Sequence, residues 1–233
     1  MKTAIITGAS VGIGRAAAAR FVADGYRVFN LARRECPEAG VDNLSCDLAG
    51  DADIARCCET VLDAVTASDS VALIHNASQM RKDSTMDCDS DSLRAVLETN
   101  VVAINSINRH LLPSLPAGSS LLYVGSTLAE KAVPGSFSYV LSKHAQLGIM
   151  RASCQDLMGS GIHTALICPG FTDTEMLRTH IGDDVTVVQA ISAMNSYNRL
   201  IEPAEIAELL HWAHHNPVIN GSVLHANLGQ RES

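Results

Sequence analysis

Short apolar runs alternate with longer helical patterns along the whole chain, and this alternation limits the possible folds more than any other feature. Seven runs have the character of strands: Thr3–Thr7, Arg27–Ala32, Leu44–Cys46, Ser70–His75, Ser119–Val124, His163–Cys168 and Ser222–His225. Five stretches between them have helical character: Ile13–Asp24, Asp51–Ala67, Ser90–Leu112, Ser136–Met158 and Ala204–His214. The pattern predicts a single α/β domain over residues 1–233, with a Rossmann-type doubly wound parallel sheet of about seven strands and helices on both faces.

One segment, about 171–201, departs from this rhythm because it is long and mixes apolar with polar residues. After Thr174 it carries apolar residues such as Met176, Leu177, Ile181, Val187, Val188, Met194 and Tyr197. Long segments of this kind in compact domains are usually functional lids. We expect a lid that closes a hydrophobic pocket over a substrate, with Met80, Leu128 and Val133 adding to the pocket. The alternative is that these side chains only pack the segment onto the domain.

Composition excludes several classes of function. The net charge of −8 argues against a nucleic acid partner, which requires a clustered positive surface. No apolar run is long enough to cross a bilayer, and Met1–Lys2 leads directly into an apolar strand rather than a signal peptide. The seven cysteines and nine histidines show no metal-ligand spacing, so we expect no metal and reduced thiols. These features favour a cytoplasmic protein that acts on a small molecule.

A glycine-rich turn joins the first strand to the first helix. Its glycines are Gly8, Gly12 and Gly14, in the spacing G-x-x-x-G-x-G. Glycines let the backbone approach a diphosphate closely, and the N-terminus of the following helix offers unpaired N–H groups and a favourable dipole. We therefore expect this turn, with Ser10 and Ile13, to bind a dinucleotide. An ordinary strand-to-helix turn is the alternative.

The end of the second strand bears on which dinucleotide binds. A carboxylate there would accept hydrogen bonds from the adenosine ribose, whereas a 2′-phosphate requires a cation. The chain has Arg33 and Arg34 at this place, and Glu35 lies past the strand end. Arg33 therefore favours NADP(H) over NAD(H). The alternative is a pair of solvated loop arginines.

With these features placed, the chain resembles the single-domain type of short-chain dehydrogenase/reductase (SDR) over nearly its whole length. The residues that carry the resemblance are Thr7–Gly14 (the family's TGxxxGxG), Asp47 with Leu48, His75–Ser78 (NNAG), Asn100, Ser126, Tyr139 with Lys143 (YxxxK), and Pro169–Gly170 with Thr172 and Thr174 (PGxxxT). His75 and Ser78 depart from the NNAG pattern, and Val11 stands where many NADPH-preferring relatives carry a basic residue. The last departure weakens the case for NADP(H), so NAD(H) stays as the less favoured cofactor.

The resemblance implies roles for these residues. Asp47 and Leu48 would contact the adenine end of the cofactor. Asn76 and Ala77 would line its middle. The residues of the PGxxxT element would cradle the nicotinamide end, which Tyr139 and Lys143 would also contact. Asn100 would hold a water that links Lys143 to solvent. The family's assemblies also imply a homodimer or homotetramer built on the helices Ser90–Leu112 and Ser136–Met158. Apolar positions there fit either an interface or packing on the sheet: Ile104, Ile107, Leu111, Leu147 and Met150.

The chemistry of carbonyl reduction fits the residue types at these positions. Tyr139 and Lys143 are four residues apart on an expected helix and therefore share a face. A lysine cation at ~5 Å, worth about 3 kcal/mol at an effective dielectric of ~20, would lower the pKa of the tyrosine by roughly two units. Ser126 ends a strand at the sheet edge where ligands bind, so its hydroxyl could stabilise the substrate oxygen.

The favoured function is therefore reduction of a ketone or aldehyde by NADPH, with Tyr139 as general acid and a hydrophobic small molecule as substrate. A non-catalytic dinucleotide sensor on the same fold is the alternative, although such proteins typically lose the tyrosine or lysine. A sugar-nucleotide epimerase would need a larger C-terminal region than the residues after Ile201 provide.

Overall fold

The computed structural model describes residues 1–182 and 184–231, and its centre is one seven-stranded sheet. The strands are β1 (Lys2–Thr7), β2 (Arg27–Ala32), β3 (Val41–Ser45), β4 (Ser70–His75), β5 (Ser120–Val124), β6 (His163–Pro169) and β7 (Ser222–Ala226). They lie in the order β3-β2-β1-β4-β5-β6-β7, and every neighbouring pair is parallel. The expected Rossmann-type sheet is confirmed, and its order reverses between β1 and β4.

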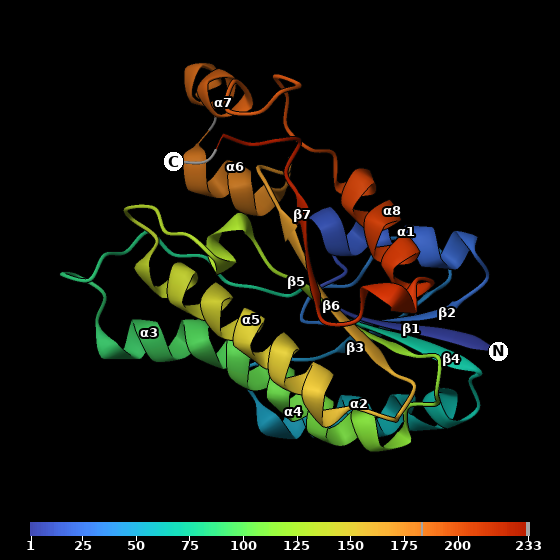
Figure 1. Ribbon diagram of the computed structural model, residues 1–233. Helices are drawn as coiled ribbons and strands as arrows, with labels where there is room; N and C mark the ends of the chain where they lie inside the picture. The colour runs from blue at the N-terminus through green and yellow to red at the C-terminus, as the bar shows by residue number, and fades with distance from the viewer. Residues whose placement is uncertain (183, 232–233) are drawn as a thin grey trace.

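Helices cover both faces of the sheet. They are α1 (Gly12–Ala23), α2 (Asp51–Thr66), α3 (Ser90–Leu97), α4 (Ala103–Leu111), α5 (Phe137–Asp156), α6 (Glu175–Ile181), α7 (Val185–Ser192) and α8 (Pro203–His214). Short helical turns lie at η1 (Glu98–Val102), η2 (Leu112–Ser114), η3 (Thr127–Ala129) and η4 (Pro217–Ile219). Figure 1 shows α1 and α8 side by side on one face and α2, α4 and α5 on the other. Each face has its own apolar core, because strand side chains alternate between the two helix layers.

Two expected boundaries are wrong. The third strand begins at Val41 rather than Leu44, because an edge strand tolerates exposed polar residues such as Asp42 and Asn43 that an apolar criterion misses. The expected helix Ser90–Leu112 is not continuous. It is interrupted by η1, a π-helical turn that contains Asn100.

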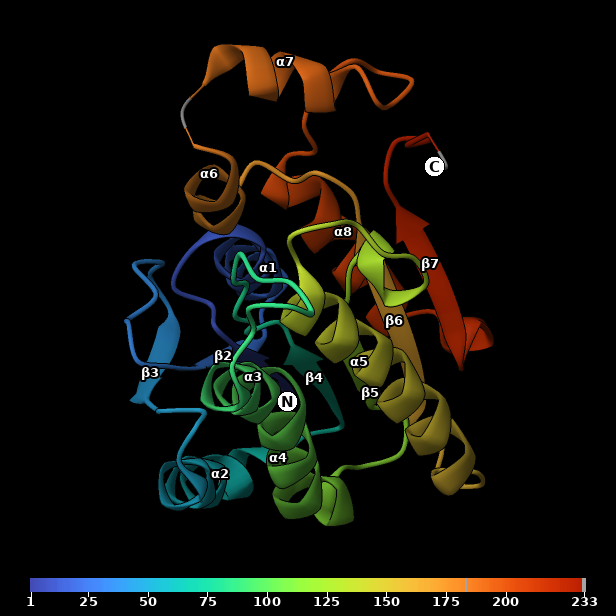
Figure 2. The same ribbon diagram turned by 90° about the vertical axis from the view of Figure 1, so that its left-hand side faces the viewer.

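The segment 171–201 contains two short helices, α6 and α7, which lie beyond the carboxyl ends of the strands (Figure 2). The two ends of the segment are hydrogen-bonded to each other. Thr172 and Ile201 form a parallel bridge, in which the Ile201 amide donates to the Phe171 carbonyl at 2.9 Å and the Asp173 amide donates to the Ile201 carbonyl at 2.9 Å. The segment therefore leaves and rejoins the domain at one point.

The apolar positions expected either at an interface or on the sheet are buried within this one chain. Ile104, Ile107 and Leu111 on α4 are at most 3% exposed, and Leu147 and Met150 on α5 also belong to the core beneath them. They pack on the sheet, so they give no support for an oligomer.

All seven cysteines are free thiols. Among the residues that the structure describes, no helix has the length and apolar character needed to cross a membrane.

Two core histidines should make the fold sensitive to acid. Burial lowers the pKa of His75 to about 4 and that of His214 to about 3. Between these values and the unfolded pKa near 6.5, only the unfolded chain binds the protons, so stability should fall as the pH drops through this window. Each histidine should remove about 2 kcal/mol between about pH 7.5 and about pH 5. We expect a His75→Asn variant to lose less stability than the parent protein over this range, as measured by urea unfolding at the two pH values. Equal losses would contradict a neutral buried His75.

Candidate functional site

A pocket of about 1010 Å³ opens at the carboxyl edge of the sheet, where the strand order reverses between β1 and β4. Open α/β sheets bind ligands at this place. Most residues singled out in the sequence line it: Gly8, Ser10, Gly12, Ile13, Arg33, Asp47, Leu48, Asn76, Ala77, Ser126, Tyr139, Lys143, Pro169, Gly170, Thr172 and Thr174. Gly14 and Asn100 are not part of the lining. Gly14 lies against Gly8 and Asn76, which line the pocket. Asn100 is hydrogen-bonded to Gln79, another lining residue.

The glycine turn is held in shape by contacts with the end of β4. The Thr7 hydroxyl accepts hydrogen bonds from the backbone amides of Asn76 and Ala77, both at 3.0 Å. The Asn76 side chain donates to the carbonyls of Thr7 and Gly8, also at 3.0 Å. Gly8 and Gly12 have φ of 69° and 56°, a region that favours glycine. The turn therefore depends on its glycines and is fixed before any ligand arrives.

The end of the pocket near β2 carries positive charge. Arg33 is exposed and, among the described residues, forms no ion pair or side-chain hydrogen bond. Its neighbour Arg34 forms an ion pair with Glu175 at 3.1 Å. This pair joins the end of β2 to the first residue of α6, and the side chain of Thr174 lies against Gly12. The segment 171–201 thus contacts the glycine turn near its start.

The opposite end of the pocket brings together Ser126, Tyr139 and Lys143. Ser126 precedes η3, and its hydroxyl accepts a hydrogen bond from the Leu128 amide at 3.1 Å and also bonds the Tyr139 hydroxyl. Lys143 lies one turn after Tyr139 on α5, and its Nζ is 5.3 Å from the centre of the tyrosine ring. The Lys143 ammonium donates to the Val124 carbonyl at 2.9 Å. The expected grouping of three residues from two elements is present.

The expected direction of the tyrosine pKa is wrong for this structure. Burial raises the pKa of Tyr139 to about 12, and the hydrogen bond with Ser126 offsets this only in part. Burial also lowers the pKa of Lys143 to about 7. Both side chains are removed from water, with exposures of 8% and 1%. Spacing alone suggested that the lysine charge would dominate, but loss of hydration outweighs it because it disfavours the charged form of both groups.

Asn100 lies in the π-helical turn η1 and is fully buried. Its side chain accepts a hydrogen bond from the Gln79 amide at 2.7 Å and donates to the Gln79 carbonyl and to the Ser142 hydroxyl, both at 2.9 Å. Its backbone carbonyl accepts a hydrogen bond at 2.9 Å from Gln146, a residue that the sequence analysis did not consider. The available signal was a polar residue one turn after Lys143 on the same helix.

The pocket wall near the segment 171–201 is partly apolar. Met80, Leu128 and Val133 line it together with Met176, Leu177, Ile181 and Met194 of the segment. Val187, Val188 and Tyr197 of the segment are not among the lining residues. Several polar or aromatic lining residues were missed by the sequence analysis: Gln79, Lys82, Lys131, Phe171, His180 and Gln230. All but His180, which lies on α6, come from loops, where spacing does not indicate the direction of a side chain.

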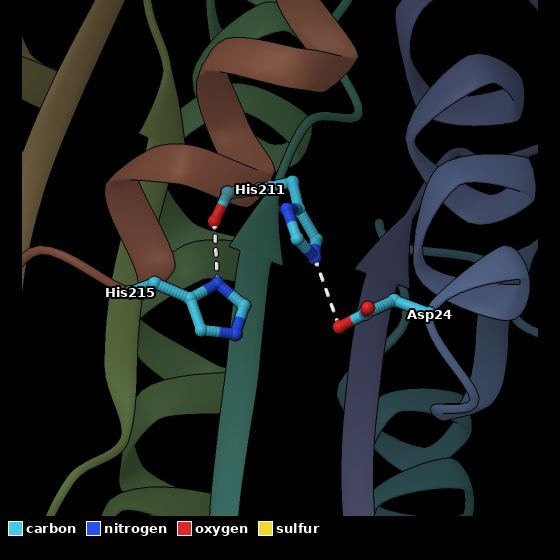
Figure 3. Close-up of side chains that lie close together, drawn as sticks. All are labelled: Asp24, His211 and His215. Atoms are coloured by element: carbon cyan, nitrogen blue, oxygen red, sulfur yellow. Dashed lines mark hydrogen bonds and ion pairs between the residues drawn. The ribbon is translucent and has the colours of Figure 1, made fainter.

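A second group of ligand-type side chains lies outside the pocket, between the ends of α1 and α8 (Figure 3). Donor atoms of Asp24, His211 and His215 lie within 4.8 Å of one another. His211 Nε2 is 3.1 Å from the Asp24 carboxylate, and His215 Nδ1 is 2.9 Å from the His211 carbonyl. The Lys2 ammonium lies 3.8 Å from the same carboxylate and disfavours a cation there. The four-residue spacing of the two histidines was overlooked in the sequence, and the group ties α1 to α8.

Comparisons with known proteins agree with this geometry. A family model described as enoyl-(acyl carrier protein) reductase matches residues 8–230. A putative ketoacyl reductase of Streptomyces coelicolor is 29% identical over 232 residues, which cover 90% of this chain and 88% of the relative. An A-factor type gamma-butyrolactone 1′-reductase (1S-forming) of Streptomyces virginiae is 30% identical over 230 residues, which cover 91% and 87%.

A solved structure of a short chain dehydrogenase from Burkholderia cenocepacia J2315 in complex with NADP has a TM-score of 0.87 to this chain at 26% identity. The match covers 98% of this chain and 97% of the other. The sheet order, the glycine turn and the grouping of Ser126, Tyr139 and Lys143 occur together with these likenesses over nearly the full length. The chain belongs to the short-chain dehydrogenase/reductase family and is an oxidoreductase.

Proposed function

We propose that the protein reduces a ketone or aldehyde to an alcohol, with NADPH as the hydride donor and Tyr139 as the general acid. One observation carries the proposal. Ser126, Tyr139 and Lys143 meet at one end of a continuous pocket whose other end is formed by the glycine turn and Arg33. The relatives described as a ketoacyl reductase and a butyrolactone 1′-reductase support a carbonyl substrate, and the NADP complex of the Burkholderia protein supports the cofactor.

The residues at the turn fit a dinucleotide. Val11, which precedes α1, makes no side-chain cap, so N–H groups of the first helical turn are available to a diphosphate. A Cβ atom at Gly14 would collide with the Gly8 carbonyl, so this space admits only backbone. The glycine turn with Asp47, Leu48, Asn76 and Ala77 would hold the cofactor, and the segment 169–174 would hold its nicotinamide end. When bound, the nicotinamide supplies the hydride.

The chain itself supplies the proton and the orientation of the carbonyl. Because the pKa of Tyr139 is about 12, its hydroxyl keeps its proton at neutral pH, which is the form that a general acid needs. The Ser126 hydroxyl bonds this same hydroxyl, so a carbonyl oxygen placed between them would meet two donors. As the oxygen becomes an alkoxide it would take the Tyr139 proton. The apolar wall formed by the lid would hold a hydrophobic substrate and exclude water.

We further propose a cytoplasmic homodimer or homotetramer, on the family resemblance alone.

A panel of ketones, diketones and acyl thioesters tests the proposed function directly. Consumption of NADPH would be followed by absorbance for each compound, with NADH in parallel. We expect turnover with at least one hydrophobic carbonyl compound and a preference for NADPH. Tight binding of NADPH without turnover on any compound would favour a non-catalytic dinucleotide sensor instead.

The choice of cofactor should depend on Arg33. An Arg33→Ala variant should raise the Kd for NADPH by about 10- to 100-fold, because a hydrogen bond to a charged phosphate is worth about 1.5–3 kcal/mol. The Kd for NADH should change by no more than about twofold. Fluorescence titration with both cofactors measures the two constants, and Arg27→Ala, at the far end of the same strand, is the matched control. Equal losses for both cofactors would show that Arg33 does not contact the 2′-phosphate.

A further inference from the structure

We propose that Gln146 is a positioning residue whose side chain bridges Lys143 and the backbone carbonyl of Asn100. The family resemblance led us to expect a water in this place. The inference rests on the proposed function, because it assigns a device that holds the catalytic lysine. It concerns a side chain that is not part of the pocket wall.

The geometry is a chain of two hydrogen bonds. The Lys143 ammonium donates to Gln146 Oε1 at 3.1 Å, and Gln146 Nε2 donates to the Asn100 carbonyl at 2.9 Å. All three residues are at most 1% exposed. Gln146 follows Lys143 by three positions on α5, so both side chains lie on the helix face that packs against η1. The amide spans the gap between the lysine and the π-helical turn.

The orientation of the amide decides what it can do. Its nitrogen is a donor only, and this nitrogen is used by the Asn100 carbonyl, so the oxygen faces Lys143 as an acceptor. A neutral acceptor favours the protonated form of the lysine. Unlike water, an amide does not readily pass a proton along. Gln146 therefore holds Lys143 as a donor and closes the route to solvent past Asn100.

The surroundings leave one ammonium N–H for the pocket. Two of the three hydrogens are used by Val124 and Gln146, and Lys143 itself lines the pocket. The titratable groups that face Lys143 are Tyr139 on its own helix and Cys168 on β6. Burial raises the pKa of the Cys168 thiol to about 11, so it is uncharged at neutral pH. Since neither group offers a fixed negative charge, the ammonium rests on two neutral acceptors, the Val124 carbonyl and the Gln146 oxygen.

The test is a pair of substitutions with opposite expected effects. Activity should require protonated Lys143, so kcat/KM for the carbonyl substrate at saturating NADPH should fall at high pH as the lysine loses its proton. In Gln146→Glu, a nearly isosteric carboxylate should move the pH at which kcat/KM falls (the basic limb of the pH profile) up by about one pH unit. In Gln146→Leu, loss of the acceptor should move it down by about one unit. Gln155→Glu and Gln155→Leu, at an exposed position of the same helix, should leave it unchanged.

A role in packing alone would lower activity in both Gln146 variants without moving the limb in opposite directions, and that result would overturn the proposal. If Gln146→Leu does not fold, Gln146→Met supplies the downward shift, and an unmoved limb in Gln146→Glu is sufficient to refute the idea. The outcome is separable from that of the proposed function. Turnover that survives Tyr139→Phe would refute the general acid, whereas loss of turnover there with unmoved limbs in the Gln146 variants would refute only the role of Gln146.

Discussion

A Tyr139→Phe variant should lose at least about 10³-fold in kcat, within the range that general acid–base catalysis contributes. The substitution removes only the hydroxyl. The ring, which is 8% exposed and packs 5.3 Å from the Lys143 ammonium, keeps its place, so the fold and the pocket should persist. The Kd for NADPH should change by no more than about twofold. Steady-state kinetics and cofactor titration on the same preparation measure both quantities.

Tyr197→Phe is the matched control for this experiment. Tyr197 lies in the segment 171–201, is 66% exposed and does not line the pocket. Removing its hydroxyl should leave kcat unchanged. If the Tyr139 variant kept turnover within tenfold of the parent, the proton would have to come from another group, and the assignment of the general acid would be wrong.

A Gly14→Ala variant should raise the Kd for NADPH by at least about 100-fold and destabilise the fold by about 3 kcal/mol or more, as overpacking at a rigid site does. The added methyl group would collide with the Gly8 carbonyl and with the Asn76 amide nitrogen. Neither group can move freely. The Gly8 carbonyl is part of the turn, and the Asn76 amide donates two hydrogen bonds at 3.0 Å. Urea unfolding and cofactor titration measure the two effects.

Gly148→Ala is the matched control, because it adds the same methyl group at a glycine with open space around it. Gly148 lies on the exposed side of α5, and a Cβ atom there meets no other atom within 4 Å. Alanine is a better helix former than glycine, so this variant should be more stable by about 0.5–1 kcal/mol and bind NADPH normally. If both variants behaved alike, the close approach at Gly14 would not be a constraint on the turn.

The sequence predicts the sheet and the two ends of the pocket because both depend on local patterns. Continuous apolar runs mark the buried strands, and the glycine turn lies between a strand and a helix. The edge strand β3 was misplaced because its residues Asp42 and Asn43 face water and break the pattern. The interruption of the expected helix at Asn100 was missed because the π-helical turn depends on side-chain contacts of Asn100 with Gln79 and Ser142, distant in the sequence.

The electrostatics of the site could not be predicted from spacing. A separation of four residues places Lys143 beside Tyr139, but it does not reveal that both are buried, and burial decides the direction of both pKa shifts. The same holds for the ion pair of Arg34 with Glu175, whose residues are 141 positions apart. Such contacts arise only when the end of β2 and the start of α6 are folded against each other.

The bridge between Thr172 and Ile201 has a consequence for how this protein can change. Because the two ends of the intervening segment are already joined to each other, residues inserted or deleted between them alter neither strand register nor the position of Tyr139 and Lys143. The entropic cost of a longer closed segment grows only slowly with its length. Changes of length after Glu175 should therefore leave the sheet in place, so this part of the segment can vary while Thr174 keeps its contact with the glycine turn.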